Sequence, residues 1–242
     1  MKIKNLISFV IIAGAVMISS CKHSMLSSDN MKTSGDSVSY CLGVFYGNQL
    51  KEADIEGFNS ELMAKGVSEM MNKGKTKLTL EESQKFLQTY FEGLQIRIGE
   101  KNLKEGKAFL EENKKKPGIK TTASGLQYEV LTEGTGPIPK ETETVQVHYS
   151  GTLIDGTVFD SSKERNQPAQ FPVNGVIRGW QEALQLMKVG SKYKIYVPSE
   201  LGYGEHPDPR SKIKPNSVLI FEMELLSIGA SSPSTQPQVK IK

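Results

Sequence analysis

The stretch VQVHYSGTLIDGTVFDSS, residues 145–162, carries two signals that together indicate an antiparallel sheet. Apolar and polar side chains alternate from Val145 to Leu153 with the period of two that a half-buried strand requires. Asp155-Gly156 comes next, and this dipeptide between two apolar runs is a strong hairpin signal because glycine accepts the backbone angles of a tight turn. The stretch therefore predicts a strand, a tight turn and a returning strand.

The same period of two recurs on both sides of this hairpin. It predicts further strands over residues 126–131, 192–198 and 218–228. Between them, VIRGWQEALQLM (176–187) predicts one short helix near Trp180–Met187 that packs across the sheet. The expected fold class is α+β, with a C-terminal antiparallel sheet of about five strands wrapped on one short helix, over residues 117–229.

The part before residue 117 has a helical pattern instead. Asp36 can cap a helix that runs to about residue 51, and Asn59 can cap a second one that ends at Gly74. The capping-box pattern Thr79-Leu80-Glu81-Glu82 starts a third helix of about 36 residues, roughly 50 Å long, that stops before Pro117. Apolar residues thin out after residue 101, so we expect the second half of this helix to be largely exposed.

These three helices, residues 36–116, cannot close a core of their own, because each apolar stripe must be buried on something. We therefore expect an all-α dimerisation domain with a long linker helix, in which residues 36–100 join two copies of the chain. The methionines of the second helix could instead line a groove for other partners. The residues expected at the dimer seam are Phe45, Leu62, Val67, Met70, Phe86 and Phe91.

Residues 1–20 are typical of a secretory signal peptide, with two lysines followed by an apolar run that is about 18 Å long as a helix and too short for a ~30 Å hydrocarbon core. The small residues before Cys21 resemble a bacterial lipobox, which implies a lipid-anchored lipoprotein that begins at Cys21. Lys22 rather than Asp follows this cysteine, which by resemblance to the enterobacterial sorting rule implies the outer membrane of the cell envelope, facing the periplasm. A disulfide between Cys21 and Cys41 is the alternative; otherwise we expect Cys41 to be a buried helix residue.

Two further segments have a polar composition without core-forming residues. Residues 21–35 are expected to form a flexible tether, and residues 230–242 a disordered tail. The formal net charge is only +3, and no basic block is interleaved with aromatic residues, which argues against nucleic acid as a partner.

Covalent and metal-dependent chemistry find no support in the sequence. His148 and His206 are far apart, and no serine lies in a nucleophile elbow or cysteine in a metal-binding pattern. Gly134-Thr135-Gly136-Pro137 is interpreted as a turn, because no helix follows it. We therefore expect neither a metal nor a cofactor.

The remaining candidates are aromatic residues at strand ends and turns beside one acid, Asp160. Such a group indicates an apolar pocket with a few placed polar groups, although it could also be core alone. The aromatic residues are Tyr149, Phe159, Phe171, Trp180, Tyr203 and Phe221.

Four motifs in the same order carry a family resemblance over about residues 124–228. VHYSGTLIDGTVFDSS (147–162), VIRGW (176–180), VPSELGYGE (197–205) and PNSVLIFEMELL (215–226) closely resemble the FK506-binding (FKBP) class of peptidyl-prolyl cis-trans isomerases. The helical segment 36–116 resembles, by layout, the dimerisation arm of the bacterial Mip and FkpA-like branch of that family.

The resemblance implies a role for each candidate residue. Trp180 would form the floor of a proline pocket, and the hydroxyl of Tyr203 would bond a substrate carbonyl. Tyr149, Asp160 and Arg165 would form a polar network at the rim, so that Asp160, Tyr203 and Tyr149 are the catalytic candidates. The walls would be Phe159, Phe171, Val176, Ile177, Ile213 and Phe221.

The expected function is prolyl isomerisation that assists the folding of extracytoplasmic proteins, with proline-containing unfolded chains as substrates and FK506-like macrolides as inhibitors. The sequence departs from the family's pattern at Ala169 and over residues 205–214, which leaves inhibitor affinity open. Two alternatives remain: a chaperone or binding module with little turnover, and a surface adhesion or scaffold lipoprotein.

Overall fold

The computed structural model describes residues 31–53, 55–72 and 75–229, which fall into two compact units that divide between Lys77 and Leu78. The predicted signal peptide, the lipid site at Cys21 and the C-terminal tail lie outside the described residues.

The first unit holds helices α1 (Ser34–Glu52) and α2 (Ser60–Met71). Asp36 does not cap α1 as expected: Thr33 is the cap, and Asp36 is its capping-box partner, because its carboxylate accepts the Thr33 backbone N–H at 2.8 Å. The helix thus begins within the last residues of the expected tether. Asn59 caps α2 as predicted.

Neither α1 nor α2 buries a single residue within one chain. The expectation that Cys41 is buried is therefore wrong for the isolated chain, where this residue is exposed. The apolar stripes of both helices face outward, and Met70 for example keeps 53% of its surface exposed.

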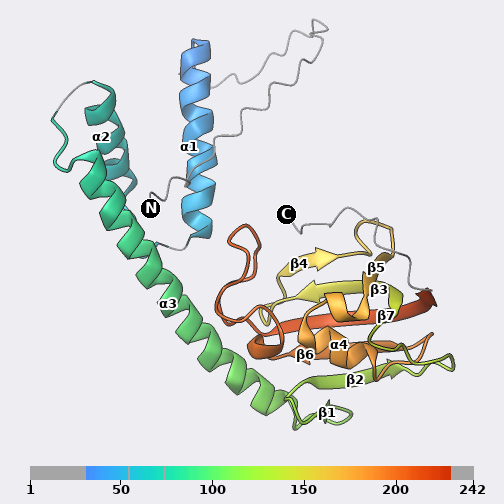
Figure 1. Ribbon diagram of the computed structural model, residues 1–242. Helices are drawn as coiled ribbons and strands as arrows, with labels where there is room; N and C mark the ends of the chain where they lie inside the picture. Colours follow the sequence, from blue (N-terminus) through green and yellow to red (C-terminus); the bar gives the residue numbers. More distant parts are fainter. Residues whose placement is uncertain (1–30, 54, 73–74, 230–242) are drawn as a thin grey trace, which may run out of the picture. The chain divides into compact units, whose positions relative to one another are not determined.

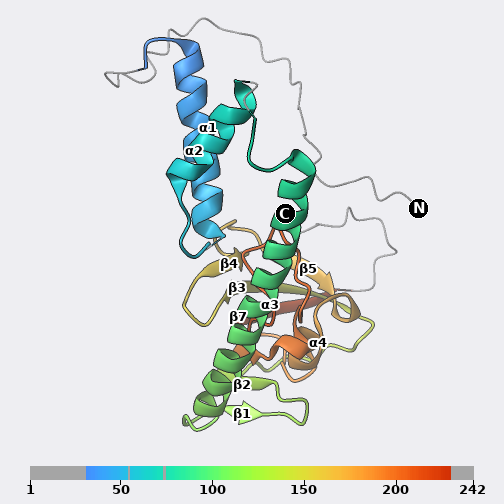
Figure 2. The same ribbon diagram turned by 90° about the vertical axis from the view of Figure 1, so that its left-hand side faces the viewer.

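The second unit begins with α3 (Leu80–Asn113), which starts at the predicted capping box of Thr79 and Glu82. Its C-terminal half leads directly into the sheet, as both views show (Figures 1 and 2). Its buried residues are Leu94, Gly99, Gly106 and Asn113; the last three recur every seven residues on one face, where they contact Pro215, Val218 and Gln127 of the sheet domain.

The sheet has seven strands, two more than expected, in the order β1-β2-β6-β7-β3-β4, with β5 also paired to β3. All pairings are antiparallel. The strands are β1 (Lys120–Thr121), β2 (Gln127–Thr132), β3 (Thr144–Thr152), β4 (Val158–Ser161), β5 (Ala169–Pro172), β6 (Lys192–Val197) and β7 (Leu219–Gly229).

The predicted hairpin is present: β3 and β4 pair antiparallel, and the turn between them has Gly156 at φ 86°, a value that favours glycine. Helix α4 (Arg178–Leu184) lies across one face of the sheet (Figure 1), and it begins two residues before the expected Trp180. Two short 3₁₀ turns, Val173–Gly175 and Ser199–Leu201, complete the domain.

The core lies between α4 and the sheet, and it explains why the helix is placed there. Leu184 and Met187 from the helical segment are fully buried against Val147 of β3 and Ile195 of β6, which belong to the same cluster. Burial of one such side chain contributes about 1.5–3 kcal/mol.

The second half of α3 is less exposed than the sequence indicated. Asn113 is fully buried and donates its amide to Oε1 of Gln127 at 2.9 Å, while Nε2 of Gln127 donates to the Leu110 carbonyl at 2.8 Å. Phe109 packs on Tyr196 of β6, with ring centroids 6.0 Å apart. The charged residues face solvent, but a narrow stripe fixes the helix to the sheet.

Gly106→Ala is expected to lower the free energy of unfolding by about 1–3 kcal/mol, the usual effect of overpacking. A Cβ at this position would lie 2.7 Å from Cγ2 of Val218. Gly93→Ala on the same helix is the matched control, because its Cβ would meet only the end of the Arg97 side chain at 3.5 Å. Urea denaturation measures both variants; equal stability of the two would contradict the packing described here.

Candidate active site

Trp180 lies in the first turn of α4, with three aromatic rings packed around it edge-on. Its ring centroid is 5.1 Å from that of Tyr149, 5.7 Å from Phe171 and 5.2 Å from Phe221, at interplanar angles of 83–88°. Phe159 continues the cluster through an edge contact with Phe221 at 5.5 Å. Edge-to-face packing of this kind fixes each ring in position.

Four different strands supply these rings: β3 carries Tyr149, β4 carries Phe159, β5 carries Phe171 and β7 carries Phe221. Burial decreases from the floor outward: Tyr149, Trp180 and Phe221 are each only 4% exposed, whereas Phe159 and Phe171 are half-buried. The remaining predicted wall residues belong to the same cluster; these are Val176, Ile177 and Ile213. All the predicted wall residues therefore belong to one hydrophobic core, in which Phe171 and Phe221 contact Trp180 directly.

Gly151 is a site residue that the sequence analysis missed. It lies opposite Phe221 in the β3–β7 pairing. A Cβ there would lie 2.6 Å from Cζ of Phe159 and 2.9 Å from Cε1 of Phe221, so the absence of a side chain makes room for both rings. The available signal was a glycine within a strand, which often marks a close approach.

The indole at the centre of this cluster is surrounded mainly by apolar groups. The indole Nε1 of Trp180 is buried and has no hydrogen-bond partner among the described residues. The rings that contact it are those of Tyr149, Phe171 and Phe221. The surroundings of the indole are therefore mainly apolar, which is typical of the walls of a small-ligand site.

A polar network closes one side of the cluster, with the three members that were predicted. The Tyr149 hydroxyl donates to Oδ2 of Asp160, Nη1 of Arg165 donates to Oδ1 of Asp160 at 2.5 Å, and Nη2 of Arg165 donates to the Tyr149 hydroxyl at 3.1 Å. Burial, and next the hydrogen bond to Asp160, raise the pKa of Tyr149 to about 12. The hydroxyl therefore keeps its proton at neutral pH and remains a donor.

Tyr203 follows the second 3₁₀ turn, and its side chain is 39% exposed. Enough protein surrounds the ring that burial raises the pKa of Tyr203, and the negative charge of Asp160 raises it further. Its hydroxyl has no hydrogen-bond partner within the described part of the chain. It is a protonated donor that is available to a ligand.

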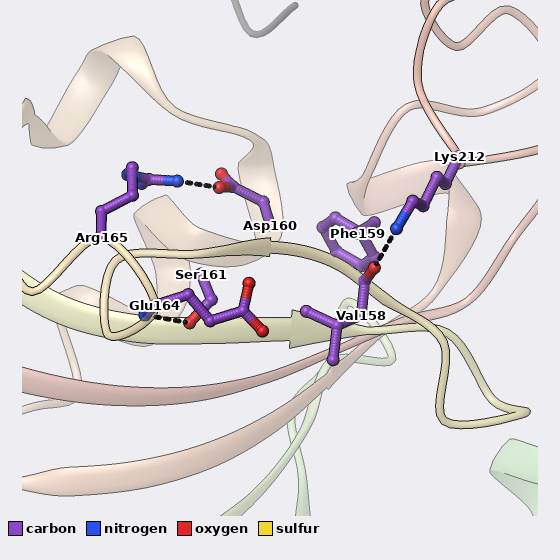
Figure 3. Close-up of a pocket in the computed structure, with 7 residues that line it drawn as sticks. All are labelled: Val158, Phe159, Asp160, Ser161, Glu164, Arg165 and Lys212. Carbon is purple, nitrogen blue, oxygen red and sulfur yellow. Dashed lines mark hydrogen bonds and ion pairs between the residues drawn. The ribbon is translucent and has the colours of Figure 1, made fainter. Parts of the chain in front are cut away.

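A shallow pocket of about 390 Å³ lies beside this network (Figure 3). Figure 3 shows the Asp160–Arg165 pair on one side of it, and on the other the Lys212 ammonium, which donates to the Val158 carbonyl at 3.1 Å. Glu164 and Lys212 were not among the predicted site residues, because neither belongs to an aromatic pattern. The lining residues are Val158, Phe159, Asp160, Ser161, Glu164, Arg165 and Lys212.

His148 contacts a serine that also bonds to the backbone of β3. Its Nδ1 lies 3.1 Å from Oγ of Ser162, and the same hydroxyl accepts the Tyr149 backbone N–H at 2.7 Å. In the described ranges, no group of three or more His, Cys, Asp or Glu side chains is arranged to hold a metal ion. Among the helices described, none combines the length and apolar character needed to cross a bilayer.

Comparison with known proteins agrees with this geometry. Residues 136–226 match the family model described as FKBP-type peptidyl-prolyl cis-trans isomerase, and residues 35–130 match the model described as the domain amino terminal to it. The FkpA isomerase of Aeromonas hydrophila is 45% identical over 208 residues, which cover 81% of this chain and 75% of the relative. The outer membrane protein MIP of Legionella longbeachae is 39% identical over 230 residues, which cover 90% of this chain and 97% of the relative.

A solved structure extends the likeness to the fold. The crystal structure of FkpA from Escherichia coli matches with a TM-score of 0.61 and 35% identity, covering 82% of this chain and 98% of that one. The α+β fold with its helical N-terminal region is thereby confirmed. The chain belongs to the FKBP-type peptidyl-prolyl cis-trans isomerases, enzymes that catalyse rotation about the peptide bond before proline.

Proposed function

We propose that the aromatic cluster around Trp180 is the proline pocket of this isomerase, and that its substrates are proteins that fold outside the cytoplasm. The observation that carries the proposal is a buried indole framed edge-on by Tyr149, Phe171 and Phe221 beside the Tyr149–Asp160–Arg165 network. FK506-like macrolides would compete for the same pocket.

The chemistry needs no nucleophile, because isomerisation rotates a bond and breaks none. Amide resonance sets a barrier of about 18–20 kcal/mol for a general peptide bond, and uncatalysed exchange before proline takes about 10–100 s. The twisted transition state has lost that resonance and is less dipolar than the planar amide. An apolar pocket therefore stabilises the transition state more than the ground state, which is the condition for catalysis.

The polar groups hold the substrate in this pocket. The free hydroxyl of Tyr203 would donate to a substrate carbonyl next to the proline, and the network would fix the Tyr149 ring that forms one wall. The shallow pocket with Glu164 and Lys212 would receive a residue that flanks the proline.

Tyr203→Phe is expected to lower kcat/KM about three- to tenfold, the effect of one lost hydrogen bond of about 0.5–1.5 kcal/mol. Asp160→Ala should lower it at least as much, because Asp160 accepts hydrogen bonds from both Tyr149 and Arg165. Tyr196→Phe on β6 is the control, because it removes a hydroxyl from a tyrosine outside the pocket. A protease-coupled assay with a short X-Pro peptide measures all three. Unchanged rates in both pocket variants would overturn the site assignment, and turnover near zero in the wild type would favour a binding module.

We also propose that the protein is a homodimer joined through residues 36–100. The apolar side chains of this part remain exposed to solvent in a single chain, which supports a second copy of the chain as the partner that buries them. The exposed members at the proposed seam are Phe45, Leu62, Val67, Met70, Phe86 and Phe91.

Lipid attachment at Cys21 would place the enzyme at the outer membrane, facing the periplasm. The lipobox-like residues before Cys21 and the following Lys22 support this location over the adhesion or scaffold alternative. One relative carries the name outer membrane protein MIP.

A lipid anchor at Cys21 predicts a defined N-terminus of the mature protein. Mass spectrometry of the native protein should find acylated Cys21 at the N-terminus, and the protein should partition into detergent. Cys21→Ser is expected to shift it to the aqueous phase, whereas Cys41→Ser should not. An unmodified N-terminus, or a disulfide between the two cysteines, would contradict the proposal.

A further inference from the structure

A short segment joins the pocket to the long helix. Pro215 and Asn216 lie between the wall residue Ile213 and strand β7. The Asn102 side-chain amide on α3 donates to the Pro215 carbonyl at 2.8 Å, and the Asn216 side-chain amide donates back to the Gly99 carbonyl at 3.3 Å. Two side-chain amides thus connect the segment and the helix in opposite directions.

Gly99 makes this close approach feasible. A Cβ there would lie 3.2 Å from Cβ of Pro215 and 3.3 Å from Nδ2 of Asn216, tighter than ordinary contacts. Gly106 faces Val218 seven residues further on, along the same face of α3. A glycine inside a helix destabilises it by about 0.5–1 kcal/mol relative to alanine, so two of them on one face indicate a packing requirement.

Asn216 has a second link, toward the active site. Its backbone N–H donates to the carbonyl of Gly204 at 2.8 Å, and Gly204 directly follows Tyr203. Asn216 has φ 57°, a left-handed conformation that asparagine tolerates better than most residues. One residue therefore contacts α3 through its side chain and the Tyr203 turn through its backbone.

We propose that Asn216 is a positioning residue, and that through it α3 holds Tyr203 in place for catalysis. The inference rests on the role proposed above for the Tyr203 hydroxyl. That hydroxyl has no partner of its own in the described part of the chain, so the turn must set where the ring points. A donor misplaced by about 1 Å loses much of its effect on rate.

Asn216→Gly tests the side-chain link alone. Glycine retains the left-handed backbone and the N–H bond to Gly204, while the amide that reaches α3 is lost. We expect kcat/KM to fall about three- to tenfold in the full chain, with a similar fall for Asn102→Ala, which removes the second amide. Lys104→Ala, an exposed change on the same helix, is the control and should leave the rate unchanged.

A double-mutant cycle with Tyr203→Phe separates positioning from general destabilisation, at a temperature at which every variant is folded. If α3 acts through Tyr203, Asn216→Gly and Asn102→Ala should have almost no further effect once the hydroxyl is absent. Equal losses in both backgrounds would overturn the inference, and so would no loss in the presence of Tyr203. Tyr203→Phe alone reports on the proposed function, so a failure of that role is recognised separately.

Discussion

Trp180→Ala is expected to reduce kcat/KM about fiftyfold, the largest effect of any single change in the pocket. In the pocket proposed above, the indole would form the floor for the proline ring, whose three methylenes contribute about 0.8 kcal/mol each when they are buried. The same change removes a side chain that is only 4% exposed, and it should lower the free energy of unfolding by about 3–5 kcal/mol.

Met187→Ala distinguishes these two effects. Met187 is fully buried beneath the same helical segment but is not among the pocket residues, so its loss should destabilise the domain by about 2–5 kcal/mol and leave kcat/KM nearly intact. Rates are compared at a temperature at which both variants remain folded by circular dichroism. An equal loss of activity in the two variants would show that Trp180 acts through stability alone.

Removal of everything before Leu94 is expected to convert a dimer into a monomer that still isomerises short peptides but no longer suppresses aggregation of an unfolded protein. The structure sets this cut, because Leu94 is the first buried residue of α3 and the contacts at Gly99, Asn102 and Gly106 stay in place. Two linked pockets can bind one client, so that the second binding event takes place at a high effective concentration. The overall avidity then rises by about 10²–10⁴ without any new contact.

A matched pair of variants tests the same idea in the full chain. Met70→Glu places a charge on the outward apolar stripe of α2 and should yield monomers, whereas Ser68→Glu, two residues earlier, should remain dimeric. Light scattering gives the mass, and turbidity of a chemically unfolded client gives the chaperone activity. If the full soluble chain were monomeric at micromolar concentration, the proposed homodimer would be contradicted.

The main strands and the hairpin could be predicted because their signals are local. Asp155-Gly156 sets the turn, and the alternation in β3 and β7 sets which side chains face α4. Strand β5 (Ala169–Pro172) was missed, since four residues that end in proline show almost no periodicity; its place is set by pairing with β3. The two-residue β1 was missed for the same reason.

Some residues of the site could likewise be predicted from the sequence, and others could not. The rings around Trp180 were predicted from their aromatic pattern and the family resemblance. Gly151 and Asn216 were missed, because a glycine within a strand is only a weak signal and Asn216 belongs to no aromatic pattern. Each matters because of a neighbour more than 60 positions away, Phe221 for Gly151 and Gly99 for Asn216. Likewise, the glycines of α3 look like weak points of a helix until the residues that face them are known.

Trp180 is the single tryptophan of the chain, and it lies buried at the centre of the aromatic cluster that we propose as the proline pocket. Light that only tryptophan absorbs therefore excites one defined place in the enzyme. The indole has an apolar environment, so its emission should be blue-shifted relative to a tryptophan in water and should change when a proline-containing chain or a macrolide covers it. The unmodified enzyme thus carries an intrinsic optical probe of pocket occupancy, by which binding can be followed separately from turnover.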